Sequence, residues 1–206
     1  RERHALQQLK TFTRWWNTLL IVRGMKATNL IQDVRPGVLP IVLFEQLAGT
    51  LVRKYNEKPS SRFQMVENQN LFLGLLKEKG IRLVNIGGTD LTDGNRTLLL
   101  GLTWTLIMRY EIQKYGADES ELLRWVKRST QGYKGVKVSG WSDSFNDGLA
   151  FCALINKHDP SALDYSKCDP SRPLENLELA FKVAEEQFGV PRLLEPDELV
   201  DETSKD

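Results

Sequence analysis

Hydrophobic residues recur every three or four positions along most of the chain, which is the spacing of amphipathic helices. Residues 6–22 show it most clearly, with Leu6, Leu9, Phe12, Trp16 and Leu19, and Gly24 follows as a stop signal. The same spacing predicts further helices over 36–47, 63–80, 96–116, 119–129, 147–157, 173–188 and 196–200. The chain is therefore predicted to be all-α.

Prolines and glycines mark several of the predicted helix ends. Pro36, Pro173 and Pro196 suit the first turn of the helices that they begin, because a first-turn residue needs no backbone N–H partner. Pro40 lies inside a predicted helix and is expected to restrict its first turns. The segment LTDGN, residues 91–95, is predicted to be a turn.

The two halves of the chain repeat one another. The paired markers stand 108 to 111 positions apart and keep their order: Trp15 and Trp125, Gly37 and Gly148, Asn68 and Asn176, Gly80 and Gly189, Asp93 and Asp201. Two copies of one domain are therefore predicted, over 6–114 and 119–206, with the short linker YGADE at 115–119.

The repeat also predicts that one helix is missing. The first copy closes with a long apolar helix at about 95–112, whose counterpart would fall at about 203–221, beyond Asp206. We therefore expect the second domain to lack its last helix and to expose an apolar groove where that helix would lie.

Composition narrows the functional class. The chain has 206 residues, of which 41% are hydrophobic and 27% charged, the ordinary balance of a soluble globular protein. Its net charge of +1 gives no global field that would attract nucleic acid. Only two cysteines, Cys152 and Cys168, are present, and the apolar runs are shorter than the roughly 20 residues of a membrane span. We expect a reduced, intracellular protein.

No constellation of residues supports catalysis, metal binding or nucleotide binding. His158 lies at a predicted helix end, where it can interact with terminal carbonyls, and no nucleophile can be assembled around it. The spacing of Cys152 and His158 does not suit zinc, and GGTDLTDGN lacks the ligand pattern of a calcium loop. We predict no enzyme activity, no metal and no cofactor.

Several stretches together resemble a known family. KTFTRWWN, VNIGGTDLTDGN, LLLGLTWTLIMRYEIQ, LLRWVKRST, FNDGLAFCALINKHDP and NLELAFKVAEEQFGVPRLLEPDELVD are similar to the tandem calponin-homology actin-binding domain of the α-actinin, filamin and spectrin superfamily. The resemblance runs from Leu9 to Asp201, with a type 1 domain followed by a type 2 domain. It departs from the family at Arg35-Pro36-Gly37, where an acidic or polar residue usually precedes the glycine.

The resemblance implies a non-catalytic module that binds filamentous actin in a crosslinking or membrane-anchoring protein of the cytoplasm, at the actin cytoskeleton and cell cortex. The first domain would supply most of the affinity and the second would modulate it. Any oligomerisation would use regions outside this chain. The alternatives are a phosphoinositide-binding adaptor at a membrane surface, or a calponin-homology module for another cytoskeletal or signalling partner.

Three helical segments would contact actin. The first helix contributes Lys10, Thr11, Thr13, Arg14, Asn17 and Thr18. The last helix of the first domain contributes Thr97, Thr105, Met108, Arg109, Glu111 and Gln113. The first helix of the second domain contributes Glu121, Arg124, Lys127 and Arg128 more weakly. The loop TQGYKGVKVSGW resembles a phosphoinositide-sensitive segment, in which Lys127, Arg128, Lys134 and Lys137 would hold a phosphorylated headgroup.

The tryptophans need separate interpretation. The resemblance implies that Trp15 and its repeat counterpart Trp125 lie in the domain cores, and the spacing of Trp16 from Phe12 and Leu19 also favours burial. Stacking on nucleic-acid bases would instead need exposed rings on a basic groove. Trp104 lies on an apolar helix, where a side chain is by default expected to be buried in the core. The resemblance implies a role at the interface between the domains.

Overall fold

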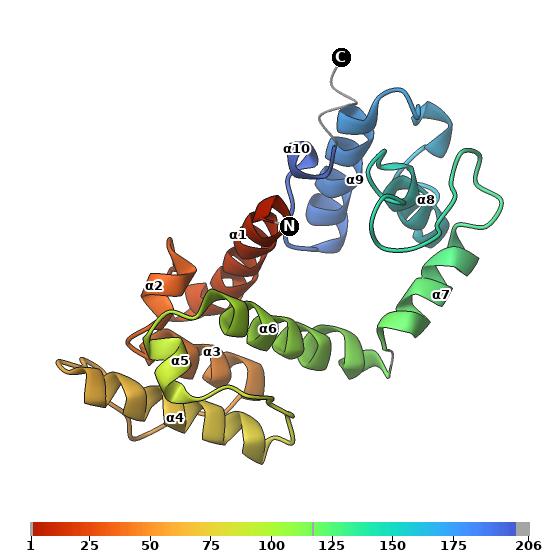
Figure 1. Cartoon of the computed structure of the whole chain (residues 1–206). Coiled ribbons are helices and arrows are strands. Elements are labelled where there is room, and N and C mark those ends of the chain that lie inside the picture. Colours follow the sequence, from red (N-terminus) through yellow and green to blue (C-terminus); the bar gives the residue numbers. More distant parts are fainter. Residues whose placement is uncertain (1, 117, 201–206) are drawn as a thin grey trace. The chain divides into compact units, whose positions relative to one another are not determined.

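The computed structural model describes residues 2–116 and 118–200. The chain forms two compact units, Arg1–Tyr115 (unit 1) and Gly116–Asp206 (unit 2). Every regular element in the described ranges is helical (Figure 1), which confirms the all-α prediction. None of the described helices is long and apolar enough to cross a membrane.

Unit 1 is built on four main helices. Its elements are α1 (Glu2–Leu20), η1 (Ile21–Arg23), α2 (Leu30–Val34), α3 (Val38–Ala48), α4 (Arg62–Glu78), α5 (Gly88–Thr92), α6 (Arg96–Ile107), the π-helical turn η2 (Met108–Ile112) and η3 (Gln113–Tyr115). Helix α1 packs against α3 and α6, and α3 packs against α4. The core between them holds the fully buried side chains of Trp16, Leu20, Ile41, Leu43, Phe72, Leu76 and Leu106.

Unit 2 repeats part of this arrangement. Its elements are α7 (Glu119–Ser129), α8 (Leu149–His158), η4 (Tyr165–Lys167), α9 (Pro173–Phe188) and α10 (Pro196–Leu199). Helix α8 packs against α7 and α9, and α10 packs against α9. Pro173 and Pro196 occupy the first helical turns that were predicted for them. His158 ends α8, as predicted, and the edge of its ring meets Phe188 with 5.1 Å between the ring centroids.

The sequence pattern was wrong at two places in unit 1. Pro36 precedes Gly37, the N-cap of α3, so it lies in the turn before the helix and not in its first turn. Leu91 and Thr92 close the short helix α5, where only a turn was predicted. Helices of five residues, such as α2 and α5, are too short to show a hydrophobic period, and local capping bonds stabilise them.

A buried asparagine fastens the start of α3 to α4 in unit 1. The Nδ2 of Asn68 donates to the carbonyls of Pro36 (3.0 Å) and Asn56 (2.8 Å), and its Oδ1 accepts from the Asn56 N–H (2.8 Å). Gly37 lies against this side chain with a left-handed φ of 80°. Each polar atom of the Asn68 amide therefore has a partner, as burial requires.

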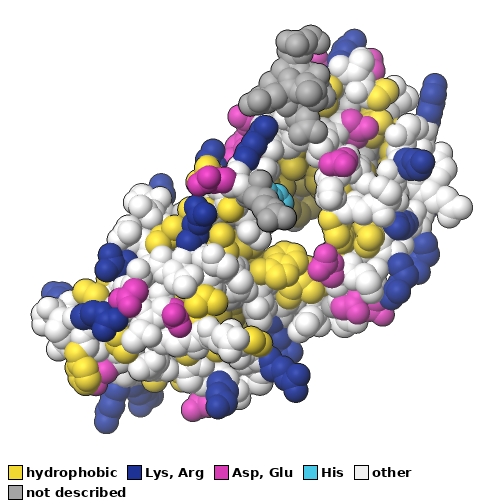
Figure 2. All heavy atoms as spheres, in the orientation of Figure 1, with side chains coloured by type: hydrophobic (Ala, Val, Ile, Leu, Met, Phe, Trp, Pro, Cys, Tyr) yellow, Lys and Arg dark blue, Asp and Glu magenta, His cyan; other side chains and the backbone are white. Residues whose placement is uncertain are grey.

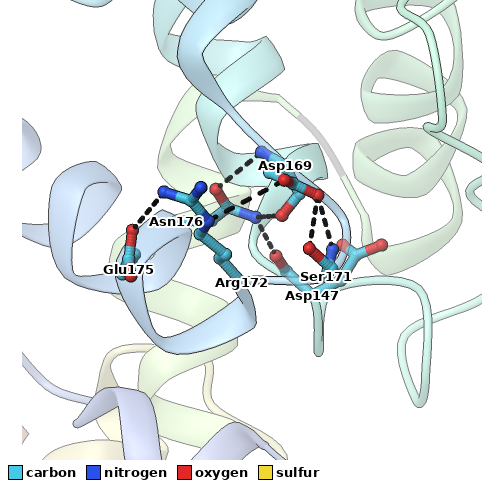
Figure 3. Close-up of polar contacts among 6 residues, drawn as sticks. All are labelled: Asp147, Asp169, Ser171, Arg172, Glu175 and Asn176. Atoms are coloured by element: carbon cyan, nitrogen blue, oxygen red, sulfur yellow. Dashed lines mark hydrogen bonds and ion pairs between the residues drawn. The ribbon is translucent and has the colours of Figure 1, made fainter.

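Unit 2 repeats this bonding pattern around Asn176 (Figure 3). Its Nδ2 donates to the carbonyls of Asp147 (2.9 Å) and Asp169 (2.7 Å), and its Oδ1 accepts from the Asp169 N–H (3.2 Å). Gly148, with φ of 76°, takes the place of Gly37. The Asp169 carboxylate in turn accepts from the N–H and hydroxyl of Ser171, which shapes the loop before α9. The repeat seen in the sequence is therefore a repeated hydrogen-bond network.

Candidate functional site

The adjacent tryptophans of α1 join this helix to the end of unit 1. Trp16 is fully buried, and its Nε1 donates to the Thr103 hydroxyl on α6 at 3.1 Å. Trp15 is 3% exposed, and its Nε1 donates to the Glu111 carboxylate on η2 at 3.1 Å. Both burial predictions are confirmed. The two indoles bring the first two predicted binding segments, α1 and α6–η2, side by side.

The prediction that Trp125 lies in the core of unit 2 is wrong. Its side chain is 50% exposed, whereas the next residue, Val126, is buried against Phe145 and Ala150. In unit 1 the counterpart Trp15 is covered because α6 and η2 follow α5 and pack against α1. Within residues 118–200 no helix takes that place, so the indole stays open to solvent.

Unit 2 also shows the apolar groove that the repeat predicted. The groove has a volume of about 310 Å³ and lies between α8, α9 and the segment 190–194. Its aromatic and aliphatic lining includes Phe151, Leu154, Ile155, Phe181, Val190 and Leu193. The repeat counterparts of Leu154 and Ile155 are Leu43 and Phe44, which are buried in unit 1.

The predicted residues of α1 divide into two groups. Lys10 is exposed, and Thr11, Thr13, Arg14, Asn17 and Thr18 are half-buried. The hydroxyls of Thr13 and Thr18 donate to carbonyls of their own helix, at Leu9 and Trp15. The Asn17 amide pairs with both backbone groups of Ala27, at 2.9 and 2.7 Å, so it fixes the chain that follows α1. Lys10 and Arg14, one turn apart, are the cationic side chains of this face.

The α6–η2 segment presents a mixed surface. Thr97, Arg109, Glu111 and Gln113 are exposed, Thr105 and Met108 are half-buried, and the Thr105 hydroxyl donates to the Gly101 carbonyl at 2.9 Å. Trp104 is also exposed, so the default expectation of a core position was wrong. The π-helical turn holds Glu111 where its carboxylate accepts the Trp15 bond; such turns are frequent at functional sites.

Sequence reasoning missed a loop that flanks this surface. Residues Arg82, Leu83, Val84 and Ile86, between α4 and α5, form a shallow pocket of about 220 Å³ with Thr97, Leu98 and Thr105 of α6. Val84 is strongly exposed, and the next residue, Asn85, has a positive φ of 51°. The run IRLVNI, apolar but without helical spacing, was the available signal.

Helix α7 carries the third predicted segment and belongs to unit 2. Asp118 caps it by accepting from the Glu121 N–H at 2.8 Å, a bond that holds the pKa of the Asp118 carboxyl below its usual value. Glu121, Arg124, Lys127 and Arg128 are all exposed, and Arg124 pairs with Glu121 at 3.7 Å. The two basic residues in the last turn suit the negative end of the helix.

The basic loop after α7 is held to unit 2 by two tyrosines. The Tyr165 hydroxyl donates to the Lys134 carbonyl at 2.8 Å, and the Tyr133 hydroxyl donates to Asn156 Oδ1 at 2.8 Å. The two rings meet edge to face with 4.8 Å between centroids. Burial raises the pKa of Tyr165 to about 12, so the donor stays protonated at neutral pH. Lys134 and Lys137 point outward from an anchored loop.

The two cysteines lie in unit 2 and are packed together in an apolar cluster with Leu163 and Ala180. The buried Cys152 thiol donates to the Asn176 carbonyl at 3.3 Å, and burial raises the pKa of both thiols. Among residues 2–116 and 118–200, no three His, Cys, Asp or Glu side chains are grouped in a way that could hold a metal ion.

The chain is thus a tandem of two related helical units, and in the first unit tryptophans join the opening helix to the closing one. The model of the calponin homology (CH) domain matches residues 6–112 and 117–206, and the chain belongs to this family. Calponin homology domains are non-catalytic, and the chain is not an enzyme.

Named relatives agree with this assignment. The chain is 41% identical over 204 residues to sarcomeric α-actinin of Drosophila melanogaster, covering 97% of this chain and 22% of the relative. It is 41% identical over 200 residues to α-actinin-like protein 1 of Schizosaccharomyces pombe, covering 94% and 32%. The crystal structure of the actin-crosslinking core of S. pombe fimbrin superposes with a TM-score of 0.83 at 25% identity, over 95% of this chain and 44% of that one. The chain thus spans about a fifth to a third of these α-actinin relatives.

Proposed function

We propose that this chain binds filamentous actin as part of a cytoskeletal protein that crosslinks filaments or anchors them at the cell cortex. The proposed functional domains are residues 6–114 and 119–206. Similarity to α-actinins and to the actin-crosslinking core of fimbrin supports the partner. The observation that carries the proposal is the tryptophan pair, which unites α1 and α6–η2 into one surface.

The chemistry of this surface suits an acidic filament. Lys10 and Arg14 on α1 and Arg109 on η2 supply positive charge, while Met108 offers apolar area for burial. Mixed surfaces of this kind gain affinity from apolar contact and gain orientation and association rate from charge. Unit 1 would therefore supply most of the affinity.

Unit 2 would modulate that affinity. Its exposed helix α7 offers Glu121, Arg124, Lys127 and Arg128 as a weaker third contact. If unit 2 docks on unit 1 so as to cover part of the filament face, the apparent affinity falls by the fraction of time spent closed. Unit 1 alone would then pellet with filaments at least as well as the whole chain.

Reversing one charge on the proposed face tests the assignment. Lys10→Glu is expected to weaken co-sedimentation with filamentous actin by about five- to tenfold, because it replaces attraction by repulsion at the interface. Raising the salt concentration should weaken the binding of the unchanged chain in the same direction.

Lys77 supplies the matched control. It is an exposed lysine near the end of α4 in the same unit, and α4 carries none of the residues of the proposed face. Lys77→Glu should leave pelleting unchanged. Equal losses for both variants would show a diffuse charge effect and would contradict the proposed face.

A second function is favoured by the anchored basic loop. We propose that Lys127, Arg128, Lys134 and Lys137 bind a phosphoinositide headgroup, since Tyr165 and Tyr133 fix the loop that carries Lys134. Replacing Lys134 and Lys137 by glutamine should weaken binding of soluble inositol trisphosphate by about twentyfold, at roughly fivefold per charge. Isothermal titration calorimetry would measure it.

Lys157 is the control for this titration, as an exposed lysine of α8 in the same unit. Lys157→Gln should titrate like the unchanged chain. If it weakens headgroup binding as much as the loop variant does, the loop is not a specific site.

A further inference from the structure

Three large aliphatic side chains of unit 1 are exposed to an unusual extent. Ile21 and Val22, in the 3-10 turn η1, are 70% and 69% exposed, and Leu51, in the loop after α3, is 70% exposed. Single apolar residues on a surface are common and need no explanation. Here, however, the three residues lie in two segments that the fold ties to one carboxylate.

A buried carboxylate holds the two segments together. Glu45 near the end of α3 is 5% exposed, and its two oxygens accept from the Arg23 guanidinium at 2.7 Å and from the Val52 N–H at 2.8 Å. Arg23 follows Ile21 and Val22 in the chain, and Val52 follows Leu51. Proximity to Glu45 also contributes to the raised pKa of the Tyr55 phenol, whose largest cause is burial. The aliphatic residues are thus fixed at the same end of unit 1, next to one anchor.

The same two segments concentrate positive charge. Residues 21–28 and 49–58 contain Arg23, Lys26, Arg53, Lys54 and Lys58; the only acidic residue within them is Glu57, and Arg23 is paired with Glu45. The whole chain is nearly balanced, with 28 basic and 27 acidic residues. On the one face that Figure 2 shows, yellow hydrophobic side chains reach the surface beside dark-blue Lys and Arg. The hydrogen bonds of Glu45 hold η1 and the 49–58 loop, which carry both the aliphatic and the basic side chains, at one end of unit 1.

We infer that Ile21, Val22 and Leu51 insert into the surface of an anionic lipid bilayer, with Lys26, Arg53 and Lys54 facing the headgroups. Aliphatic side chains next to cations are the pattern of interfacial membrane binding, where buried apolar area and attraction to anionic lipid add together. This contact lies in unit 1 and uses none of the residues named for the filament face or for the basic loop of unit 2.

The test is sedimentation of the whole chain with vesicles. Phosphatidylcholine vesicles that contain phosphatidylserine should pellet the chain, and vesicles of phosphatidylcholine alone should not. Substituting serine for Ile21, Val22 and Leu51 together should reduce binding by about a hundredfold to a thousandfold, at roughly five- to tenfold per inserted side chain. Lys26→Gln with Lys54→Gln should reduce it by about 25-fold, at roughly fivefold per charge.

Phe63→Ser is the matched control. Phe63 is 71% exposed in the same unit, and its basic neighbour Arg62 is paired with Asp93 at 2.8 Å. This variant should bind vesicles like the unchanged chain. Circular dichroism and actin co-sedimentation check that each variant is folded and keep this test separate from that of the proposed function.

Two results would overturn the inference. One is no binding to phosphatidylserine vesicles, and a second is full binding by the triple serine variant. In the first case, loss of filament pelleting by the triple variant would assign these residues to an acidic protein surface. Competition by soluble inositol trisphosphate would also count against it, because that ligand belongs to the unit 2 loop.

Discussion

Replacing Trp15 by alanine is expected to lower the free energy of unfolding of unit 1 by about 3–5 kcal/mol, the range for removing a buried tryptophan. The side chain is 3% exposed, so its removal leaves a cavity where α1 meets α6 and η2. The exposed Glu111 carboxylate loses its Trp15 partner but remains solvated, so that loss adds little. Filament binding should fall as well, because the two segments of the proposed face are no longer held together.

Trp125→Ala is the internal control for this result. Trp125 occupies the same repeat position but is 50% exposed, so its removal should destabilise unit 2 by about 1 kcal/mol or less. Urea unfolding followed by hydrogen exchange of peptides from α1 and from α7 would separate the two units. If Trp15→Ala and Trp125→Ala lowered the free energy of unfolding of their units equally, this would contradict the difference in burial. It would also contradict the role given to the tryptophan pair.

The main helices could be predicted because each has a long periodic pattern and a clear stop. Helices α7 and α9 begin and end where the sequence predicted, with Pro173 in the first turn of α9 and the left-handed Gly189 after it. Helices α2 and α5 could not be predicted, since their five residues are stabilised by caps and by packing rather than by an amphipathic period. The change from α-helix to π-helix at Met108 has no periodic signal either.

The binding surface was harder to predict than the helices that carry it. A sequence shows which residues share a helical face, but it does not show what covers that face. Trp15 and Trp125 match in the repeat, yet only Trp15 has α6 and η2 packed against it. The same limit explains Asn17, which looks like an outward polar residue but bonds to the backbone of Ala27. Ile21 and Val22 end the predicted helix 6–22, but in the structure they belong to the 3-10 turn η1. The loop 82–86 lies outside the main periodic patterns, and only the fold shows the exposure of both segments.

Gly148→Ala is expected to destabilise unit 2 by about 2–5 kcal/mol. Its φ of 76° costs any residue with a Cβ about 1–2 kcal/mol. A Cβ at this position would also lie 2.7 Å from both the Asn176 Cβ and the Leu177 backbone nitrogen, a clash that adds about 1–3 kcal/mol. Neither atom can move aside easily, because three hydrogen bonds hold the Asn176 side chain and α9 holds the backbone.

Gly189→Ala separates the two contributions within the same unit. Gly189 has a φ of 65°, but nothing lies within 4 Å of the Cβ that alanine would add, so only the backbone strain of about 1–2 kcal/mol should appear. Hydrogen exchange of α9 peptides in urea would measure both variants. If Gly148→Ala lowers the free energy of unfolding no more than Gly189→Ala does, then α9 can shift at Asn176 to make room for the new Cβ. The hydrogen bonds of Asn176 would then not hold α9 rigidly against α8. A clearly larger cost at Gly148 would show that close approach of α8 to α9, and not turn geometry alone, requires glycine at this repeat position in each unit.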